Sequence, residues 1–201
     1  MSMSELSFEL KRDESSGKSR PRRDRVFVWS GNVGGLGLVE LVVPALELVP
    51  VTQRGLSLGA MATGESIPMS SYTGLPYDRR PRLARGKLNV AGRDAAFSRN
   101  AWRTSRQGRA LRIWAVGREY TYLEDRNKRH HVLERNGTTV MTTRSSWRDP
   151  KSVSGKARGE FDSVDISLAV LFEGIYTRNL SLRGALVSAP GRMMDRFGSL
   201  S

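Results

Sequence analysis

The segment at residues 163–176 constrains the fold more than any other part of the sequence. Its sequence, SVDISLAVLFEGIY, predicts an α-helix, because Ser163 suits the N-cap and Asp165 complements the positive end of the helix dipole. Apolar residues lie nearly all the way round this helix, whereas a surface helix shows a single apolar stripe. The segment is also too short to cross a membrane, which takes about 20 apolar residues. We therefore expect the protein's own sheets to surround it.

The sequence before this helix predicts short β-strands. The residues at 26–29 are β-branched and aromatic, and apolar runs follow at 34–43 and 45–51. Farther along, Leu111 and Ile113 alternate with Arg112 and Trp114, which places the two pairs on opposite faces of a strand. Gly117 then predicts a turn or bulge. Residues 61–82 are rich in Gly, Pro, Ser and Thr and predict a long loop.

The strongest local signal is a β-hairpin centred on Asn136-Gly137. This dipeptide favours a type I′ turn, in which both central residues have positive φ. The resulting register pairs Leu133 with Val140 and Val132 with Met141, so both faces of the hairpin carry apolar side chains. A hairpin of this kind belongs in a closed or covered sheet. We predict a mainly β protein, a closed antiparallel barrel or sandwich that encloses or covers the helix at 163–176.

The two ends of the chain differ in composition. Residues 1–24 are polar, contain few aromatic residues and carry both signs of charge, so they bury too little apolar surface to offset the entropy of ordering. This pattern predicts a disordered tail. We expect a single β-rich domain at residues 25–201, in which 26–76 is apolar and nearly neutral and 79–158 is strongly basic.

The net charge of the chain comes from its second part. The chain has 33 Lys and Arg against 20 Asp and Glu, a formal charge of +13. Residues 1–76 hold eight of each sign, whereas residues 79–158 hold 21 basic and six acidic side chains. Such a segment attracts polyanions. Arg outnumbers Lys 27 to six, a ratio that a GC-rich genome also produces, so the excess alone does not establish binding.

Motifs for catalysis and metal binding are missing from the sequence. With no cysteine, disulfides, zinc–thiolate sites and iron–sulfur clusters are excluded. His130 and His131 are adjacent, so in a strand they point to opposite faces and cannot share a metal. The acidic cluster of Glu160, Asp162 and Asp165 fits charges that complement a helix dipole, and it also fits a cation site or a pair of catalytic carboxylates. No dinucleotide-binding or P-loop motif occurs. The string GLSLG at 55–59 has the G-x-S-x-G spacing, but its apolar residues alternate as in a strand, whereas a nucleophile elbow is a strand-to-helix turn. We predict no catalytic residue, metal or cofactor, and a binding protein rather than an enzyme.

The sequence feature that favours a binding function is the combination of arginine with aromatic residues on predicted strands. Guanidinium groups bind phosphates, and aromatic rings stack on bases of single-stranded nucleic acids. Cation–π contacts within the protein and burial in its core are the alternatives for these side chains. The predicted anion-binding residues are Arg112, Arg118, Lys128, Arg129, Arg135 and Arg144, and the predicted stacking residues are Trp114, Tyr120 and Tyr122.

Many short strands followed by a late apolar helix resemble the layout of the tubby C-terminal-like superfamily, which includes the phospholipid scramblases and the LURP-one-related proteins. The resemblance rests on the Asn136-Gly137 hairpin, the basic strands around it and the helix at 163–176, and it covers residues 25–187. It is one of layout, without a diagnostic motif, and a calcium-loop signature and a scramblase-like proline-rich tail are missing. The resemblance implies a closed barrel around a central helix, with a basic outer face that binds phosphoinositides or another anion.

These patterns lead to one functional expectation and three alternatives. We expect a non-enzymatic binding module whose basic face binds an anionic ligand, such as a phospholipid headgroup. The alternatives are a structural subunit that forms an oligomer through the apolar region at 26–76, a protein that binds single-stranded nucleic acid, and a small enzyme whose site cannot be read from a single sequence. The sequence has neither a membrane-spanning segment nor a secretory signal, and we expect a cytoplasmic location.

Overall fold

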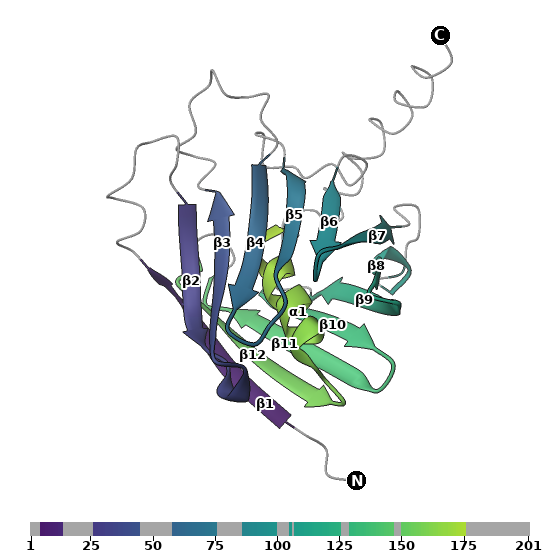
Figure 1. Ribbon diagram of the computed structural model, residues 1–201. Helices are drawn as coiled ribbons and strands as arrows, with labels where there is room; N and C mark the ends of the chain where they lie inside the picture. Colours follow the sequence, from purple (N-terminus) through teal and green to yellow (C-terminus); the bar gives the residue numbers. More distant parts are fainter. Residues whose placement is uncertain are drawn as a thin grey trace.

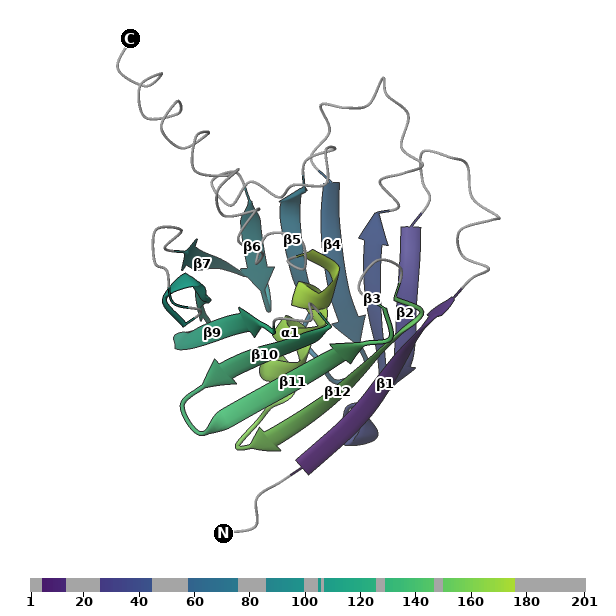
Figure 2. The same ribbon diagram turned by 180° about the vertical axis from the view of Figure 1, so that it is seen from behind.

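Twelve antiparallel strands form a closed barrel around one helix in the computed structural model (Figures 1 and 2), which describes residues 5–13, 26–44, 58–75, 86–99, 105, 107–125, 129–146 and 150–175. The strands are β1 (Glu5–Asp13), β2 (Val26–Asn32), β3 (Leu38–Pro44), β4 (Leu58–Gly64), β5 (Ser70–Leu75), β6 (Lys87–Val90), β7 (Arg93–Arg99), β8 (Leu111–Ala115), β9 (Arg118–Glu124), β10 (His130–Arg135), β11 (Thr138–Arg144) and β12 (Ser152–Gly159). The helix is α1 (Ser163–Ile175), and two short 3₁₀ helices are η2 (Gly34–Leu36) and η6 (Gln107–Arg109). The mainly β fold class and the closed barrel are confirmed.

Each strand pairs with its neighbours in the sequence, and β1 closes the barrel by pairing with both β12 and β2. Figure 2 shows β1 running beside β12. The seam between them is tightly packed, because Phe8 of β1 lies opposite Gly155 of β12. A Cβ atom at Gly155 would come within 2.0 Å of the Phe8 ring. Only glycine leaves room for this ring at the closure.

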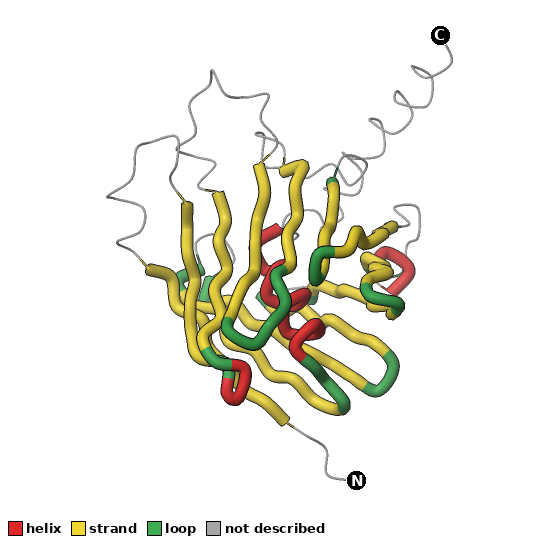
Figure 3. The backbone as a smooth tube through the Cα atoms, in the orientation of Figure 1, coloured by secondary structure: helices red, strands yellow, loops and turns green. Residues whose placement is uncertain are grey.

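Helix α1 lies inside the barrel (Figure 3), and none of its residues is exposed. Ten of its 13 residues are buried, including Leu168, Leu171 and Phe172. It packs against β3, β4 and β5 on one side and against β10 and β11 on the other. The prediction of a helix surrounded by the protein's own sheet is therefore confirmed. Within the described residues, no helix is long and apolar enough to cross a membrane.

The antiparallel order gives the barrel two distinct ends. We call the end at which α1 begins the N-rim and the end at which it ends the C-rim. The connections β2–β3, β4–β5, β6–β7, β8–β9 and β10–β11, together with the link from β12 to α1, lie at the N-rim. The strand ends at the C-rim are those that lead from β1 to β2, β3 to β4, β5 to β6, β7 to β8, β9 to β10 and β11 to β12. Every connection at the N-rim lies within the described residues.

The predicted hairpin has the expected register, with Leu133 opposite Val140 and Val132 opposite Met141. Its turn type differs from the prediction. Gly137 has a φ of 74°, but among the described residues the non-glycine positions with positive φ are only Ala91 and Val116. Ala91-Gly92 and Val116-Gly117, which join β6 to β7 and β8 to β9, therefore have the two positive φ angles of a type I′ turn.

Two predictions of irregular structure are wrong. Residues 5–13 of the predicted disordered tail form β1, because Leu6, Phe8 and Leu10 recur at every second position and the last two are buried in the core. The predicted loop at 61–82 contains the end of β4 and all of β5. Residues 14–24 and 76–82 lie outside the described residues.

Candidate functional site

The inner face of β9, β10 and β11 carries two polar layers, with an apolar layer between them. In the middle layer, Tyr122, Leu133 and Val140 lie side by side in the register. Toward the C-rim follow Glu124, His131 and Thr142, and toward the N-rim follow Tyr120, Arg135 and Thr138. Each polar layer faces one end of α1, so the sheet supplies partners for both ends of the buried helix.

At the N-rim, two arginines bind the carboxylates at the start of α1. Arg135 donates from Nε and Nη2 to the two carboxylate oxygens of Asp165, at 2.8 and 2.9 Å. Arg118 donates from Nη1 to Asp162 at 2.5 Å and lies 3.9 Å from Asp165. The bond to Asp165 raises the pKa of Arg135. Burial opposes ionisation of Asp162, but the hydrogen bond from Arg118 and bonds from the backbone lower its pKa overall.

The same carboxylates cap the helix. Asp162 Oδ1 accepts hydrogen bonds from the backbone N–H groups of Val164 and Asp165, at 3.0 and 3.2 Å. Asp165 Oδ2 in turn accepts from the backbone N–H of Asp162 at 2.8 Å. These bonds satisfy backbone donors that an α-helix leaves unpaired at its start. The sequence allowed three interpretations of the acidic cluster: charges at a helix start, a cation site or a catalytic pair. The contacts support the first, in the form of helix capping. Within the described residues, no three His, Cys, Asp or Glu side chains are placed to hold a metal ion.

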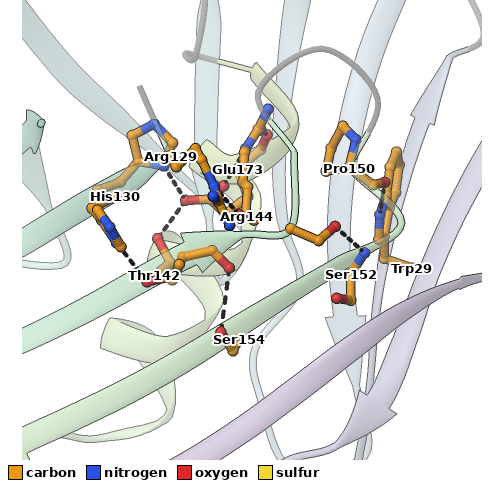
Figure 4. A network of polar contacts seen from close by, with 12 residues as sticks. Trp29, Arg129, His130, Thr142, Arg144, Pro150, Ser152, Ser154 and Glu173 are labelled. Carbon is orange, nitrogen blue, oxygen red and sulfur yellow. Dashed lines mark hydrogen bonds and ion pairs between the residues drawn. The ribbon is translucent and has the colours of Figure 1, made fainter. Parts of the chain in front are cut away.

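At the C-rim, Glu173 in the last turn of α1 is the centre of a buried network (Figure 4). Its Oε1 lies 2.7 Å from His131 Nδ1 and accepts a hydrogen bond from the hydroxyl of Thr142. Its Oε2 accepts from Arg144 Nε at 2.6 Å, and Arg144 Nη2 donates to the backbone carbonyl of Glu173. The side chains of Glu173 and His131 are completely buried. Burial opposes ionisation of Glu173, but the charges and hydrogen bonds of its partners lower its pKa to about 2.

The two histidines have different surroundings, as their alternation along the strand predicts. His130 is exposed, and its Nδ1 lies 2.8 Å from the hydroxyl of Thr143. His131 points into the barrel, where its ring stacks on Tyr122 with 5.8 Å between centroids. Because Glu173 is ionised and can only accept, the Nδ1–H group of His131 donates the hydrogen bond to that carboxylate. Among the residues that the structure describes, none is a hydrogen-bond partner of His131 Nε2.

Three of the predicted anion-binding residues are engaged inside the protein. Arg118 and Arg135 bind Asp162 and Asp165 at the N-rim, and Arg144 binds Glu173. Their positive charges therefore neutralise the carboxylates at the two ends of α1, and the binding of an external anion by these residues stays a prediction. Reading each strand alone could assign these arginines to a face, but their carboxylate partners lie 25 or more residues away in the chain.

The predicted stacking residues are divided between the two faces of the barrel wall. Tyr120 and Tyr122 are each only 1% exposed and lie in the core, so they cannot stack on an external base. Burial is the main cause that raises the pKa of Tyr120 to about 12. Trp114 is 39% exposed on the outer face of β8, together with Arg112. The prediction for the two tyrosines is wrong, because the face of β9 that carries them is the interior of the barrel.

Arg129 and Arg144 belong to an arc of basic residues at the C-rim that we call the rim arc. Its members, Arg129, Arg144, Lys151 and Arg12, lie at the ends of the adjacent strands β10, β11, β12 and β1. Arg129 Nε donates to the carbonyl of Arg144 at 2.9 Å, and the backbone N–H of Arg12 donates to the carbonyl of Lys151 at 2.8 Å. Arg129 and Lys151 are exposed, whereas Arg144 is buried.

The Arg12 member of the rim arc lies over two aromatic rings. Its guanidinium carbon is 5.1 Å from the centroid of Phe27 and 6.0 Å from that of Trp29. The Trp29 indole N–H donates to the carbonyl of Pro150 at 3.1 Å, which ties β2 to the start of β12 (Figure 4). Sequence reasoning missed Arg12 and Lys151. The alternation of Leu6, Phe8 and Leu10 was the available signal for a strand that carries Arg12 to this rim.

The positive charge of the chain is unevenly divided between the described residues and the rest. The described residues contain 14 Lys and Arg and 14 Asp and Glu, against 33 and 20 in the entire chain. The remaining stretches of sequence therefore hold 19 basic and six acidic residues, the whole excess of 13. Apart from residues 1–4, which are uncharged, each of these stretches is joined to the barrel at the C-rim. Lys128 belongs to one of them and lies outside the described residues.

A scan against protein-family models and searches of curated proteins and of solved structures found no match to this chain.

Proposed function

We propose that the protein is a binding module that attaches through its C-rim to a polyanionic surface, with anionic phospholipid headgroups as the ligand. The observation that carries the proposal is the division of charge along the chain. The described barrel is balanced in charge, and the excess of 13 positive charges belongs to stretches that join it at the C-rim. A basic segment near an anionic membrane gains about 1 kcal/mol for each Lys or Arg.

The rim arc supports the same location. Arg12, Arg129 and Lys151 place three basic side chains on three strands at the same end of the barrel. Arg144 anchors this region to the helix, because its side chain binds Glu173 and its backbone contacts Arg129. The backbone N–H of Arg144 donates to the carbonyl of Arg129, and the carbonyl of Arg144 accepts from Arg129 Nε. A ligand at the C-rim would therefore contact a part of the barrel that is held firmly to the helix.

The burial of the tyrosines favours phospholipid over single-stranded nucleic acid. Binding of single strands without sequence preference combines phosphate contacts with rings that stack on successive bases. Of the three predicted stacking residues, Trp114 alone is exposed, and it lies on the outer face of β8 rather than in the rim arc. Phosphate recognition without base stacking suits a lipid surface.

The resemblance to the tubby C-terminal-like superfamily is part of the same proposal. It is supported by a closed antiparallel barrel around a helix that follows the last strand. In the form proposed here, the anion would bind at the C-rim rather than along the outer face of the basic strands.

The test is co-sedimentation of the full chain with vesicles that contain phosphatidylserine, over a series of salt concentrations. The variant that combines Arg129→Gln with Lys151→Gln should bind about 20- to 30-fold more weakly, because it removes two charges from the C-rim. The matched control combines Arg93→Gln at the N-rim with Lys156→Gln on the outer face of β12, and its affinity should change less than threefold.

Three results would contradict the proposal. An affinity that hardly changes between low and moderate salt would exclude binding through phosphate charge. Equal losses in the two double variants would mean that net charge, and not the C-rim, controls binding. Tighter binding of single-stranded DNA or RNA than of the vesicles, at equal phosphate concentration, would identify a nucleic acid as the ligand.

A further inference from the structure

Two rows of apolar side chains lie on the outer face of the barrel. The first crosses β2, β3 and β4 and consists of Val28, Val42 and Met61, which are direct neighbours in the register. The second crosses β9, β10 and β11 and consists of Leu123, Val132 and Met141. Both methionines are 36% exposed, and each ends its row. The barrel therefore offers two outer surfaces with similar apolar side chains.

The two rows differ in the charges that surround them. Residues 26–44 and 58–75, which contain β2 to β5, include no Lys or Arg, and their acidic residues are Glu40 and Glu65. The second row continues into Lys156 on β12, and His130 and Glu134 lie on the same outer face of β10. The first row lies on the part of the barrel that carries the least charge.

This difference decides which surface can meet a second copy of the chain. Each copy carries a formal charge of +13, so two copies repel each other wherever basic side chains face one another. An approach through β2–β4 brings together two surfaces without Lys or Arg. A closed barrel also has no open strand edge for pairing with another chain, so association must use an outer face.

We infer that the protein forms a homodimer through the outer face of β2, β3 and β4, with the row Val28–Val42–Met61 of one protomer against the same row of its partner. A two-fold axis makes such a contact self-complementary, because the same patch serves both protomers. Polar neighbours bound the patch. In the register, Asp13 lies next to Val28 and Ser71 lies next to Met61, so an apolar centre has a polar border.

The matched methionines provide the test. Light scattering coupled to size-exclusion chromatography measures the mass of the native full chain, which should be that of a dimer at micromolar concentration and at moderate salt. Met61→Arg places two additional charges in the contact and should weaken dimerisation at least tenfold. Met141→Arg makes the same chemical change at an equally exposed position and should leave the dimer intact. Thermal unfolding of both variants controls for stability.

A second measurement does not depend on destabilising the contact. The chain has no cysteine, so Met61→Cys and Met141→Cys each introduce a single thiol. A short bismaleimide should link two copies of the Met61→Cys variant in high yield and link few copies of Met141→Cys. A monomeric native chain, a dimer that only Met141→Arg dissociates, or equal linking of the two cysteine variants would overturn the inference. Because neither substitution lies in the rim arc, vesicle binding tests the proposed function separately.

Discussion

The two ends of helix α1 are held by the same chemistry in different surroundings. At the N-rim, Arg118 and Asp162 are both more than one-third exposed. At the C-rim, the side chain of Glu173 is completely buried and that of Arg144 is 8% exposed. Water screens the first pair, whereas the second depends entirely on its protein partners. We conclude that the fold depends much more on the Arg144–Glu173 pair than on the Arg118–Asp162 pair.

The largest effect should come from removing one partner of the buried pair. Arg144→Leu leaves the carboxylate of Glu173 buried without its main cation, and the free energy of unfolding should fall by about 3–5 kcal/mol. Replacing both residues, Arg144→Leu with Glu173→Leu, should cost less than either single substitution because no unpaired charge remains. Urea unfolding of the three variants measures these differences. A loss below about 1 kcal/mol in Arg144→Leu would show that water reaches the pair.

The second-largest effect should come from acid, which lowers the free energy of unfolding by protonating Glu173 at the C-rim end of α1. Glu173 has a pKa of about 2 in the folded protein against an ordinary value of 4.5. A lowered pKa stabilises the fold above pH 4.5, and this contribution, about 3 kcal/mol, decreases as the pH falls from 4.5 toward 2. Unfolding free energies measured between pH 6 and pH 3 should fall more steeply for the native chain than for Glu173→Gln. Parallel curves for the two proteins would contradict this assignment.

A smaller effect should separate the two arginines at the N-rim. Arg135→Ala removes two hydrogen bonds from Asp165, which is 1% exposed, and should cost about 1–3 kcal/mol. Arg118→Ala acts on a pair in which both side chains are more than one-third exposed, and it should cost less than about 1 kcal/mol. Thermal unfolding of the two variants compares them directly. The reverse order would mean that Asp162, rather than Asp165, is the main anchor of the helix start.

Much of the fold could be predicted because its signals are local. Apolar residues around 163–175 identified a surrounded helix, and the Asn136-Gly137 dipeptide identified the correct hairpin register. Strand β1 was missed because its polar composition outweighed the alternation of Leu6, Phe8 and Leu10. The turn at Val116-Gly117 shows another limit. A β-branched residue rarely adopts positive φ, so nothing in the local sequence indicates that Val116 has a φ of 46°.

The candidate site could be predicted only in its residue types. Alternation along a strand correctly placed Arg112 and Trp114 on the face of β8 opposite Leu111 and Ile113. It could not show that Arg144 meets Glu173, because these residues are 29 positions apart and come together only when the helix enters the barrel. Alternation within a strand also leaves open which face becomes the interior.

The patterns along the chain were sufficient for a mainly β protein, a buried helix and a basic composition, because periodicity and charge are properties of short segments. The carboxylate partners of Arg118, Arg135 and Arg144 were settled by the closing of the barrel around α1. Closure sets which strand face becomes the interior, and burial then makes a carboxylate the required partner of an inward arginine. The same closure places at one rim the strand ends from which the stretches with the positive excess continue, since antiparallel neighbours put alternate strand ends at opposite rims.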